Sequence, residues 1–260
     1  MASTFFGLHI GSSALSSFQV ATNTTANNIA NVKTTGYTRQ EATLQAKDAI
    51  NVTARYGSVG TGVTVTSIKQ QRDLYYDNKY WENNSCYGRY EQKLYYMEQI
   101  QNYFKDNGSS VKGFSSVFSQ MFSDLDTLRS KPSDKTVRNQ FISSAQSLCT
   151  YFNQMSDNLS KLQDDCNEEI RNNVDKINSI SEKISLLNKE INQIETGTGV
   201  EAGSLRDERA NLIDSLSKIV NVSYNETEVQ NTNGDNLGGT NFSLYINAVS
   251  YTHLTLPTIR

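Results

Sequence analysis

IRNNVDKINSISEKISLLNKEINQI, residues 170–194, is the stretch that decides the fold of this chain. Its seam positions follow alternating steps of three and four, the spacing of one face of an α-helix in a coiled coil. Residues 133–196 around it contain neither glycine nor proline. As one helix, this longer segment would be about 95 Å long at about 1.5 Å per residue. We expect the aliphatic seam to hold a helical hairpin or bundle together, through Ile170, Ile177, Ile180, Ile184, Leu187, Ile191 and Ile194.

Two more helices are predicted on the N-terminal side of this segment. The first, residues 73–104, carries a seam of mainly aromatic residues at steps of four and three, which favours packing between helices. Its members are Tyr76, Tyr80, Asn83, Tyr87, Tyr90, Leu94, Met97, Gln101 and Phe104. Lys and Arg are not concentrated beside these tyrosines, which argues against a platform for single-stranded nucleic acid. Asn107–Gly108 predicts the end of this helix, and a third helix from Val111 to Pro132 has one broad apolar face.

The pattern changes on the C-terminal side of the long segment. A cluster of glycines in residues 197–203 predicts a turn, and Ser204–Asp207 matches the N-cap box of a shorter helix that ends near Val220. Beyond it the hydrophobic period becomes two, in two short segments on either side of an Asn- and Gly-rich loop at 231–241. This pattern is typical of the opening hairpin of a β domain, attached to a chain that is otherwise mainly α.

The first 32 residues contain no Asp, Glu, Lys or Arg. Ser, Thr, Asn and Gln make up nearly half of them, which argues against a membrane-spanning helix. The segment also lacks the basic start and the apolar block of a secretory signal. A narrow stripe with steps of three and four runs along it and includes Leu8, Leu15, Phe18 and Ile29. Because an isolated helix of this composition is marginal in water, we expect it to become ordered only when it packs against neighbours.

An extended arm is predicted after the uncharged helix. Residues 61–66 alternate β-branched residues behind a group of glycines, which favours a short strand or hairpin within residues 38–72. The same glycines do not form a phosphate-binding loop. No GxGxxG is present, and no Lys-Ser or Lys-Thr pair comes directly after Gly62.

These segments predict five parts of the chain. They are an N-terminal helix at 1–35, an extended arm with short strands at 36–72, a long-helix bundle at 73–220, the incomplete start of an outer β domain at 221–248 and a tail at 249–260. The last ten residues, YTHLTLPTIR, fit neither strand nor helix and resemble the translation of read-through sequence. We therefore interpret the tail as non-native and the chain as a fragment.

The composition argues against an enzyme and against a nucleic-acid-binding protein. The net charge is −3, so bulk attraction to nucleic acid or anionic lipid is not indicated. The two histidines are His9 and His253, and no HExxH, GxSxG or Cys/His metal spacing occurs. The three cysteines contain no CxxC pair, and we expect none of them to be a ligand, a catalyst or part of a disulfide. We predict no catalytic residue, no cofactor and no metal site.

Two charged clusters have ordinary helical explanations. The acidic residues within 164–169 are interpreted as a solvated helix face, in preference to a site for a hard cation. The cluster RDER, residues 206–209, is interpreted as a salt-bridged surface or as a register mark at an interface, in preference to an acid/base pair.

The sequence ANNIANVKTTGYTRQ, residues 26–40, resembles the signature of the axial proteins of the bacterial flagellum, which are the rod, hook and hook-associated proteins. In that family an Asn-rich end of the N-terminal helix and a Gly-Tyr turn recur. Two further segments are similar to the hook-associated members, GVTVTSIKQQRDLYYDNKYWENNSCYGRYEQ at 62–92 and LRDERANLIDSLSKIVNVSYNE at 205–226. The resemblance covers residues 1–248, about the N-terminal half of such a protein.

The resemblance implies a structural component of the bacterial flagellum that joins the hook to the filament. It implies export through the type III channel without a cleaved signal peptide, and an extracellular position in the flagellum. The implied partners are copies of the chain itself in a ring or tube, the hook protein and a second junction protein, with an export chaperone bound by the missing C-terminal part. The N-terminal helix is expected to pair with a C-terminal helix in the innermost layer of the tube. No nucleic-acid partner and no membrane insertion are expected.

Subunit packing is expected to use the stripe on the N-terminal helix and the turn that follows it. The expected residues are Leu8, Leu15, Phe18, Asn27, Asn28, Ile29, Asn31, Gly36, Tyr37 and Arg39. Gly36 is expected to supply a turn with positive φ, and Tyr37 and Arg39 to anchor the arm. For Phe18 and Ile29 the alternative is an ordinary intramolecular core.

Two other functions remain open from the sequence. One is a type III-exported helical effector or adhesin that binds a host partner through its coiled coil. The Gly-Tyr motif argues against it, because an effector has no need of that motif. The other is a hook or rod subunit, which the long aliphatic seam at 170–194 argues against.

Overall fold

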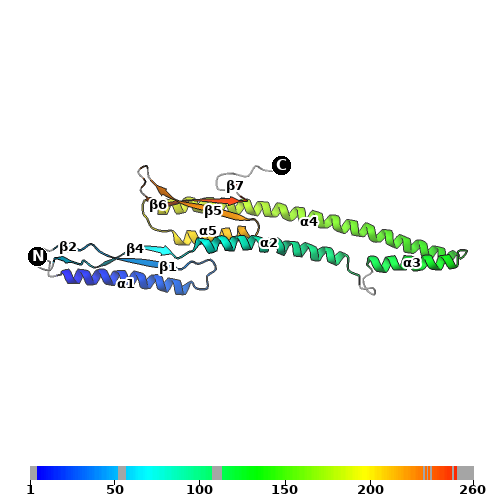
Figure 1. Cartoon of the computed structure of the whole chain (residues 1–260), viewed down its shortest axis with the longest axis horizontal. Coiled ribbons are helices and arrows are strands. Elements are labelled where there is room, and N and C mark those ends of the chain that lie inside the picture. Colours follow the sequence, from blue (N-terminus) through cyan, green and yellow to red (C-terminus); the bar gives the residue numbers. More distant parts are fainter. Residues whose placement is uncertain are drawn as a thin grey trace. The chain divides into compact units, whose positions relative to one another are not determined.

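The structure is a computed structural model that describes residues 5–51, 57–106, 113–230, 232, 234, 236–247, 249 and 250. These residues form five α-helices and seven β-strands (Figure 1). The prediction of a mainly helical fold, with an N-terminal helix, a hairpin arm and C-terminal strands, is confirmed. Asn107–Gly108, Val111 and the last ten residues of the predicted non-native tail lie outside the described residues.

The chain divides into two compact units. The first contains the described residues up to Cys86 and from Ile177 onward, and the second is Tyr87–Lys176. Two long helices, α2 (Leu74–Tyr103) and α4 (Lys135–Glu195), contribute residues to both units. The bounds of the five parts drawn from the sequence stay predictions.

The long helix expected between residues 133 and 196 is present as α4, one helix of 61 residues. At its start, Asp134 Oδ1 accepts the backbone N–H of Thr136 at 2.8 Å, as an N-cap side chain does. Beyond its end, Gly197 has φ +83°, the left-handed conformation that stops helices and that glycine adopts without strain. The seam is buried unevenly, because Ile170 and Ile194 at its two ends are exposed. Its buried members are Ile180, Ile184, Leu187 and Ile191, with Ile177 packed against the same core.

The core of the first unit contains residues from α4, from α5 (Gly203–Ser217) and from a three-stranded antiparallel sheet. The sheet has the order β5 (Val222–Gln230), β6 (Asn236–Ile246) and β7 (Val249–Ser250). Trp81 of α2 closes this core, with Nε1 donating to Asp214 Oδ1 at 2.6 Å. The buried members are Trp81, Ile180, Ile184, Ile213, Leu216, Val222, Phe242, Leu244 and Ile246.

The loop between β5 and β6 is shorter than predicted, because β6 begins at Asn236 inside the Asn- and Gly-rich stretch. Gly238 and Gly239 lie against the end of α4. A Cβ on Gly238, which has φ +89°, would meet the Glu195 carbonyl oxygen at 2.8 Å, and one on Gly239 would meet Thr196 Oγ1 at 2.4 Å. These glycines therefore allow a strand to pass close to a helix end, a purpose that their turn-like composition does not reveal.

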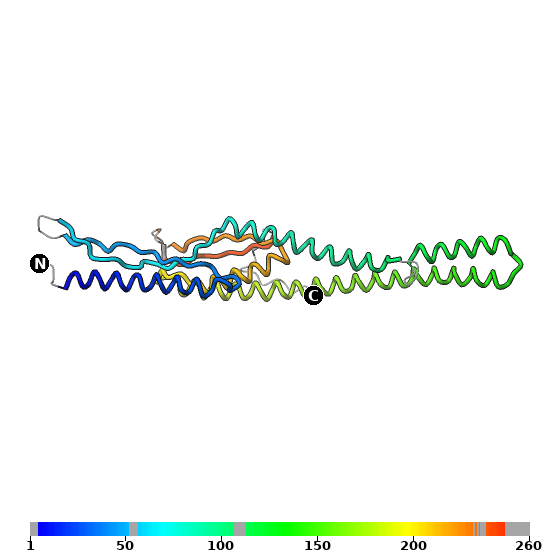
Figure 2. Tube along the Cα trace, turned by 90° about the horizontal axis from the view of Figure 1, so that it is seen from below, coloured from blue at the N-terminus to red at the C-terminus, as the bar shows by residue number. Residues whose placement is uncertain are grey.

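In the second unit, α3 (Phe114–Ser130) lies antiparallel beside the first part of α4, as Figure 2 shows. Phe114 contacts both Tyr151 and Phe152 of α4. Farther along α4, Glu169 accepts hydrogen bonds from two side chains of α2, Gln92 Nε2 and the Tyr96 hydroxyl. The contact face of α2 in this unit is therefore partly polar.

The aromatic seam predicted on α2 is not buried within the described chain. Its large residues are all exposed, namely Tyr76, Tyr80, Tyr87, Tyr90, Leu94, Met97 and Phe104. The buried or bonded side of the helix carries Trp81, Asn84, Gln92 and Tyr96 instead. The periodicity correctly identified a face of the helix, but the prediction that this face packs against other helices was wrong. The contacts of α2 come from its other side, where most of the contacting side chains form hydrogen bonds.

The N-cap box predicted at Ser204–Asp207 is wrong. Helix α5 already includes Gly203, so Ser204 lies within the helix, where its side chain is exposed. Asp207 is buried, and its carboxylate accepts the Thr38 backbone N–H at 3.3 Å and Gln70 Nε2 at 2.8 Å. A long-range contact thus replaces the local cap.

A buried ion cluster joins α4, α5 and the β5–β6 pair. Arg206 donates to Glu195 through Nε and Nη2, both at 2.7 Å, and to Glu226 through Nη1 at 3.0 Å. The Arg209 guanidinium lies over the Phe242 ring at 3.9 Å and its Nη2 is 3.5 Å from Glu226 Oε1. The RDER cluster is therefore mostly buried and intramolecular, which corrects its interpretation as a salt-bridged surface.

The protonation of this cluster follows from its burial and its charges. Burial by itself raises the pKa of Glu226, but the hydrogen bond from Thr240 and the charges of Arg206 and Arg209 outweigh burial and lower that pKa below its usual value. Burial lowers the pKa of Arg209 to about 10, so this guanidinium is charged at neutral pH. A carboxylate with a lowered pKa stabilises the fold above its unfolded-state pKa, and this stabilisation is lost as the pH falls through the folded-state pKa.

We expect the free energy of unfolding to fall as the pH is lowered below about 4.5, the ordinary pKa of glutamate. Glu226→Gln removes the titrating group, so wild type and variant should differ most at neutral pH and converge in acid. Urea unfolding at a series of pH values measures this difference. Glu228→Gln, at an exposed position of the same strand, is the matched control and should differ little from wild type at any pH. A Glu226→Gln difference that stays constant down to pH 3 would contradict the expectation.

Candidate subunit-packing site

The only residues of helix α1 (Phe6–Ala30) that are buried are the polar Ser17 and Thr24, whereas several of its large apolar residues are exposed. The helix packs on a two-stranded antiparallel sheet formed by β1 (Gln40–Ala46) and β4 (Val63–Gln70) (Figure 1). The short strands β2 (Ile50–Asn51) and β3 (Ser58–Val59) pair farther out on the same arm. Ser17 is only 5% exposed under this arm, and its hydroxyl donates to the Val63 carbonyl at 3.2 Å. Thr24, about two helical turns farther on, is also buried.

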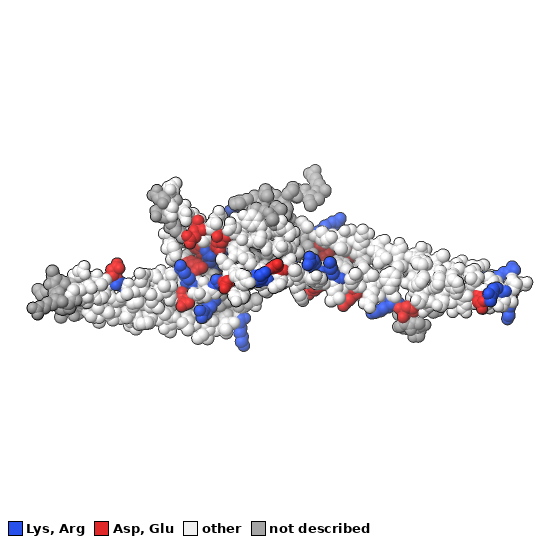
Figure 3. All heavy atoms as spheres, viewed as in Figure 1, with Lys and Arg blue, Asp and Glu red and all other residues white. Residues whose placement is uncertain are grey.

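The predicted stripe lies on the opposite side of α1. Leu15 is 72% exposed, Phe18 61% and Ile29 69%, and Leu8 is exposed to a similar degree. The alternative for Phe18 and Ile29, an intramolecular core, is therefore excluded within the described chain. Residues 6–30 of α1 contain no Lys, Arg, Asp or Glu, and most of the surface over this helix in Figure 3 is uncharged. An uncharged face with large apolar side chains in water is a face suited to contact with another surface.

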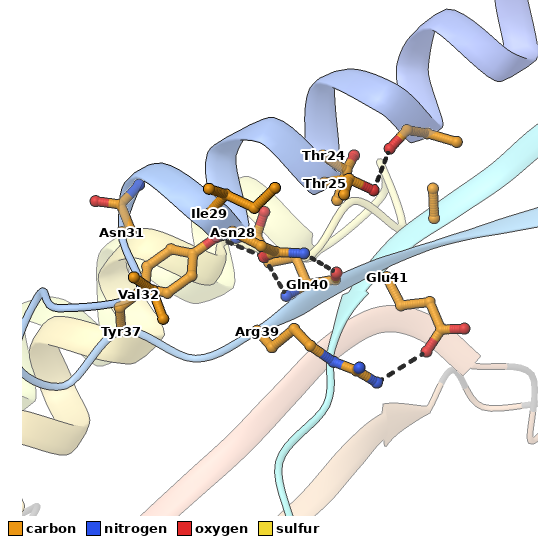
Figure 4. Close-up of a pocket in the computed structure, with 12 residues that line it drawn as sticks. Thr24, Thr25, Asn28, Ile29, Asn31, Val32, Tyr37, Arg39, Gln40 and Glu41 are labelled. Carbon is orange, nitrogen blue, oxygen red and sulfur yellow. Dashed lines mark hydrogen bonds and ion pairs between the residues drawn. The ribbon is translucent and has the colours of Figure 1, made fainter.

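The Asn-rich end of α1 is tied to the start of the arm (Figure 4). The Asn28 carboxamide accepts the Gln40 backbone N–H at 2.9 Å and donates to the Gln40 carbonyl at 2.8 Å. Because β4 pairs with the other edge of β1, Asn28 satisfies the backbone groups that a neighbouring strand would otherwise bond on this edge. The Tyr37 hydroxyl donates to Asn28 Oδ1 at 2.8 Å and accepts from Asn27 Nδ2 at 3.1 Å. Burial and the nearby Asp207 carboxylate raise the pKa of this hydroxyl, against the opposing effect of the Asn27 hydrogen bond, so that it stays protonated.

Gly36 has φ +77°, as the turn prediction requires. A Cβ at this position would lie 1.8 Å from Asn211 Oδ1 of α5, so a larger residue requires the Asn211 side chain to move as well as the strained backbone conformation. The turn therefore touches α5, which the sequence pattern did not indicate.

Gly36→Ala should destabilise the turn by about 1–2 kcal/mol through its positive φ, and further through the collision with Asn211. The amide exchange rates of residues 36–41, measured by mass spectrometry, report this local loss. Adding Asn211→Ala should relieve the collision and leave only the φ cost. Gly57→Ala is a control, because Gly57 also has positive φ but meets nothing within 4 Å. Equal effects of Gly36→Ala with and without Asn211→Ala would contradict the predicted collision cost, and would mean that the Asn211 side chain moves aside and only the positive φ matters.

The base of the arm is held from the other side by α5 and the residues before it. Glu201 Oε2 accepts the Gln70 backbone N–H at 2.9 Å, while Gln70 Nε2 donates to the Gly203 carbonyl at 2.9 Å and to Asp207. Gln70 pairs directly with Gln40 across the two strands. The first pair of the arm is thus gripped between Asn28 on one edge and Glu201 on the other.

The structure brings most of the predicted turn residues together, and of the stripe residues it places Ile29 beside them. Asn27, Asn28 and Tyr37 form one hydrogen-bonded group, and Asn31 Nδ2 donates to the Asn27 carbonyl at 3.0 Å. Arg39 is exposed and pairs only loosely with Glu41, at 3.7 Å. A groove of about 600 Å³ lies between α1 and β1, lined by residues that include Ile29 and Arg39 (Figure 4). The role of all these residues in subunit packing stays a prediction.

The sequence did not single out Gln70, Glu201 or Asp207 as arm anchors. Thr38 and Asp207 are 169 positions apart, and no local period links them. The only signal was indirect, since Asp207 is an acidic residue in an otherwise ordinary helix start. A long-range partner of this kind emerges only once the chain has folded.

Within the described residues, no helix combines the length and the apolar character that crossing a membrane requires. In the same part of the chain, no three His, Cys, Asp or Glu side chains are grouped in a way that suits a metal ion.

Two protein families match the sequence. Residues 97–244 match the family described as the flagellar hook-associated protein FlgK helical domain, and residues 8–38 match the flagella basal body rod protein family. The first match covers more than half of the chain, and the second covers most of α1 and the Gly-Tyr turn.

Similar proteins carry the same description. The chain is 34% identical over 234 residues to flagellar hook-associated protein 1 of Bacillus subtilis (strain 168), a match that covers 87% of the chain and 46% of that protein. It is 32% identical over 231 residues to flagellar hook-associated protein 1 of Salmonella typhimurium, covering 86% of the chain and 39% of the relative. The chain thus spans less than half the length of each relative.

One solved structure is also similar, that of the flagellar hook junction protein FlgK from Burkholderia pseudomallei. It aligns with a TM-score of 0.49 and 22% identity, over 65% of this chain and 27% of that one.

Proposed function

We propose a structural function for this chain, because it belongs to the family of the flagellar hook-associated protein FlgK helical domain. In this proposal the chain is part of an axial subunit that joins the hook of a bacterial flagellum to its filament. The relatives that carry the name hook-associated protein 1 support it. The proposal assigns no catalytic role and no cofactor to the chain.

The observation that carries the proposal is the inverted arrangement of α1. A helix that served only this chain's own stability would turn Leu15, Phe18 and Ile29 toward the arm. Instead it turns Ser17 and Thr24 inward and leaves the apolar stripe in water. Full burial of each large side chain is worth about 1.5–3 kcal/mol, so covering the stripe supplies a driving force for assembly.

Assembly partners follow from this face. The proposal places other copies of the chain, in a ring or tube, against α1, with the hook protein and a second junction protein at the two ends of the assembly. It also places the assembled protein outside the cell, after export without a cleaved signal peptide. The uncharged, polar composition of residues 1–32 supports passage as an extended chain that becomes ordered after export.

The experiment is complementation of a strain in which the complete gene is deleted. We expect the strain to lack filaments and to regain them, with motility, when the complete gene is restored. Leu15→Glu in that gene should abolish recovery, because a charge would be buried in the subunit contact. Gln19→Glu, at an exposed position beside the stripe, is the matched control and should restore filaments. Normal filaments with Leu15→Glu would contradict the proposed packing face, and normal filaments in the deletion strain would contradict the function.

A further inference from the structure

We propose that α5 gates the ordering of α1: the apolar stripe becomes fixed in place only after α5 has folded and gripped the arm. This inference concerns how the packing face proposed above is controlled. It rests on the proposed function only for what the stripe contacts, since the coupling between α5 and α1 is a property of the chain alone.

The first step of the coupling is the bond between α1 and the arm. Asn28 holds both backbone polar groups of Gln40, and Tyr37 adds a bridge to Asn27 and Asn28. These bonds form only when the last turns of α1 are helical, because Asn28 must reach Gln40 while the adjacent Asn27 reaches the Tyr37 hydroxyl. Conversely, they stabilise those turns whenever Gln40 is held in place.

The second step is the bond between the arm and α5. Asp207 accepts from the Thr38 backbone N–H and from the side chain of Gln70, while Glu201 accepts the Gln70 backbone N–H. Gln40 and Gln70 are directly paired. A Cβ on Gly203 would meet Gln40 Nε2 at 2.7 Å, so the first turn of α5 also touches the residue that Asn28 holds. One cross-strand pair therefore links both helices.

The elements joined in these two steps differ in how stable they are on their own. An isolated helix of the composition of α1 is marginal in water, and an isolated two-stranded hairpin is marginal as well. By contrast, α5 contributes Ile213 and Leu216 to the buried core. The core thus stabilises α5, α5 stabilises the arm, and the arm stabilises α1. A chain whose residues near 207 have not folded presents no fixed stripe, which protects it from premature association.

The test is hydrogen exchange, followed by mass spectrometry, of the 260-residue chain and its variants. Residues 20–32 should be protected in wild type and should exchange about tenfold faster in Asp207→Ala, since a lost buried hydrogen bond commonly changes an equilibrium by about this factor. Glu208→Ala makes the same charge change at an exposed neighbouring position and should leave the protection unchanged. Exchange in residues 213–217 checks that α5 stays folded in each variant.

Two further variants keep the test decisive. If Asp207→Ala unfolds α5, Gln70→Ala cuts the same link from the arm and should also release residues 20–32. Asn28→Ala should release them too, and combining it with Asp207→Ala should add little, because both act on one path. The inference is overturned if α1 is unprotected in wild type, if its protection survives Asp207→Ala and Gln70→Ala, or if the effects of Asn28→Ala and Asp207→Ala are additive.

This outcome is separable from that of the proposed function. Leu15→Glu should leave the exchange of residues 20–32 as in wild type while it prevents filament recovery. If Asp207→Ala releases residues 20–32 but Leu15→Glu has no effect on filaments, the proposed packing face is refuted and the coupling between α5 and α1 is supported. If Leu15→Glu prevents filament recovery but Asp207→Ala and Gln70→Ala leave residues 20–32 protected, the coupling is refuted and the packing face is supported.

Discussion

Ile184→Ala should lower the free energy of unfolding of the first unit by about 2–5 kcal/mol, the range found for such truncations in a packed core. Ile184 is 0% exposed and belongs to the cluster that contains Trp81, Ile213 and Leu216. Truncation removes three carbon atoms from a site that strands and helices surround, so the cavity has little opportunity to collapse. A loss of this size is a large share of the stability of an ordinary domain.

The control for this prediction lies on the same seam of the same helix. Ile194 is 45% exposed, so Ile194→Ala should cost at most about 1 kcal/mol. Urea unfolding can be followed through the fluorescence of Trp81, which is the one tryptophan of the chain and lies in the same core. Equal losses at the two positions would contradict the burial pattern and would mean that the whole seam is packed.

Ile184 and Ile194 differ in burial although both follow the same hydrophobic period, so the period predicts the helix but not how deeply each position is buried. Helix α4 was predictable because its determinants are local, namely the lack of glycine and proline and the repeat of aliphatic residues. How deeply each seam position is buried depends on which other elements lie beside it. For Ile184 those elements are α5 and the sheet, whereas Ile170 and Ile194 are exposed in the described chain.

The aromatic seam of α2 failed for a related reason. Tyr87 and Tyr90 follow the heptad spacing, yet they are exposed. The side of α2 that does pack uses Trp81 and hydrogen-bonding residues such as Tyr96, and these do not stand out in a hydrophobic pattern. A period therefore identifies a face, while the identity of its partner comes from the tertiary fold.

In the candidate site, too, the locally determined features were predictable and the long-range contacts were not. Gly36 and its positive φ were predictable, because a turn of this kind restricts the backbone locally. The stripe of Leu15 and Phe18 was predictable from its spacing. The contact between Thr38 and Asp207 was not, because it joins positions 169 apart. At Asp207 the local rule for a capping box even pointed to the wrong role.

Arg206→Ala should lower the free energy of unfolding by about 3–5 kcal/mol, because it removes one partner of a buried ion pair. Glu195 is only 2% exposed, and it receives two hydrogen bonds from Arg206 and one from the Ala202 backbone N–H. Without the guanidinium, the carboxylate stays buried with one neutral donor. Arg206→Lys keeps the charge but lacks the planar fork that reaches Glu195 and Glu226 together, so its loss should be intermediate.

Two comparisons separate this effect from a general loss of charge. Arg39→Ala removes an arginine from a loose and exposed ion pair in the same unit and should cost about 0–1 kcal/mol. Adding Glu195→Ala to Arg206→Ala removes the stranded carboxylate, so the double variant should be less destabilised than the sum of the two single variants. Urea unfolding followed by Trp81 fluorescence measures wild type and each of these variants. Strict additivity, or a loss for Arg206→Ala no greater than that for Arg39→Ala, would mean that water screens the cluster and that the tie between α4, α5 and the sheet lies in the apolar core alone.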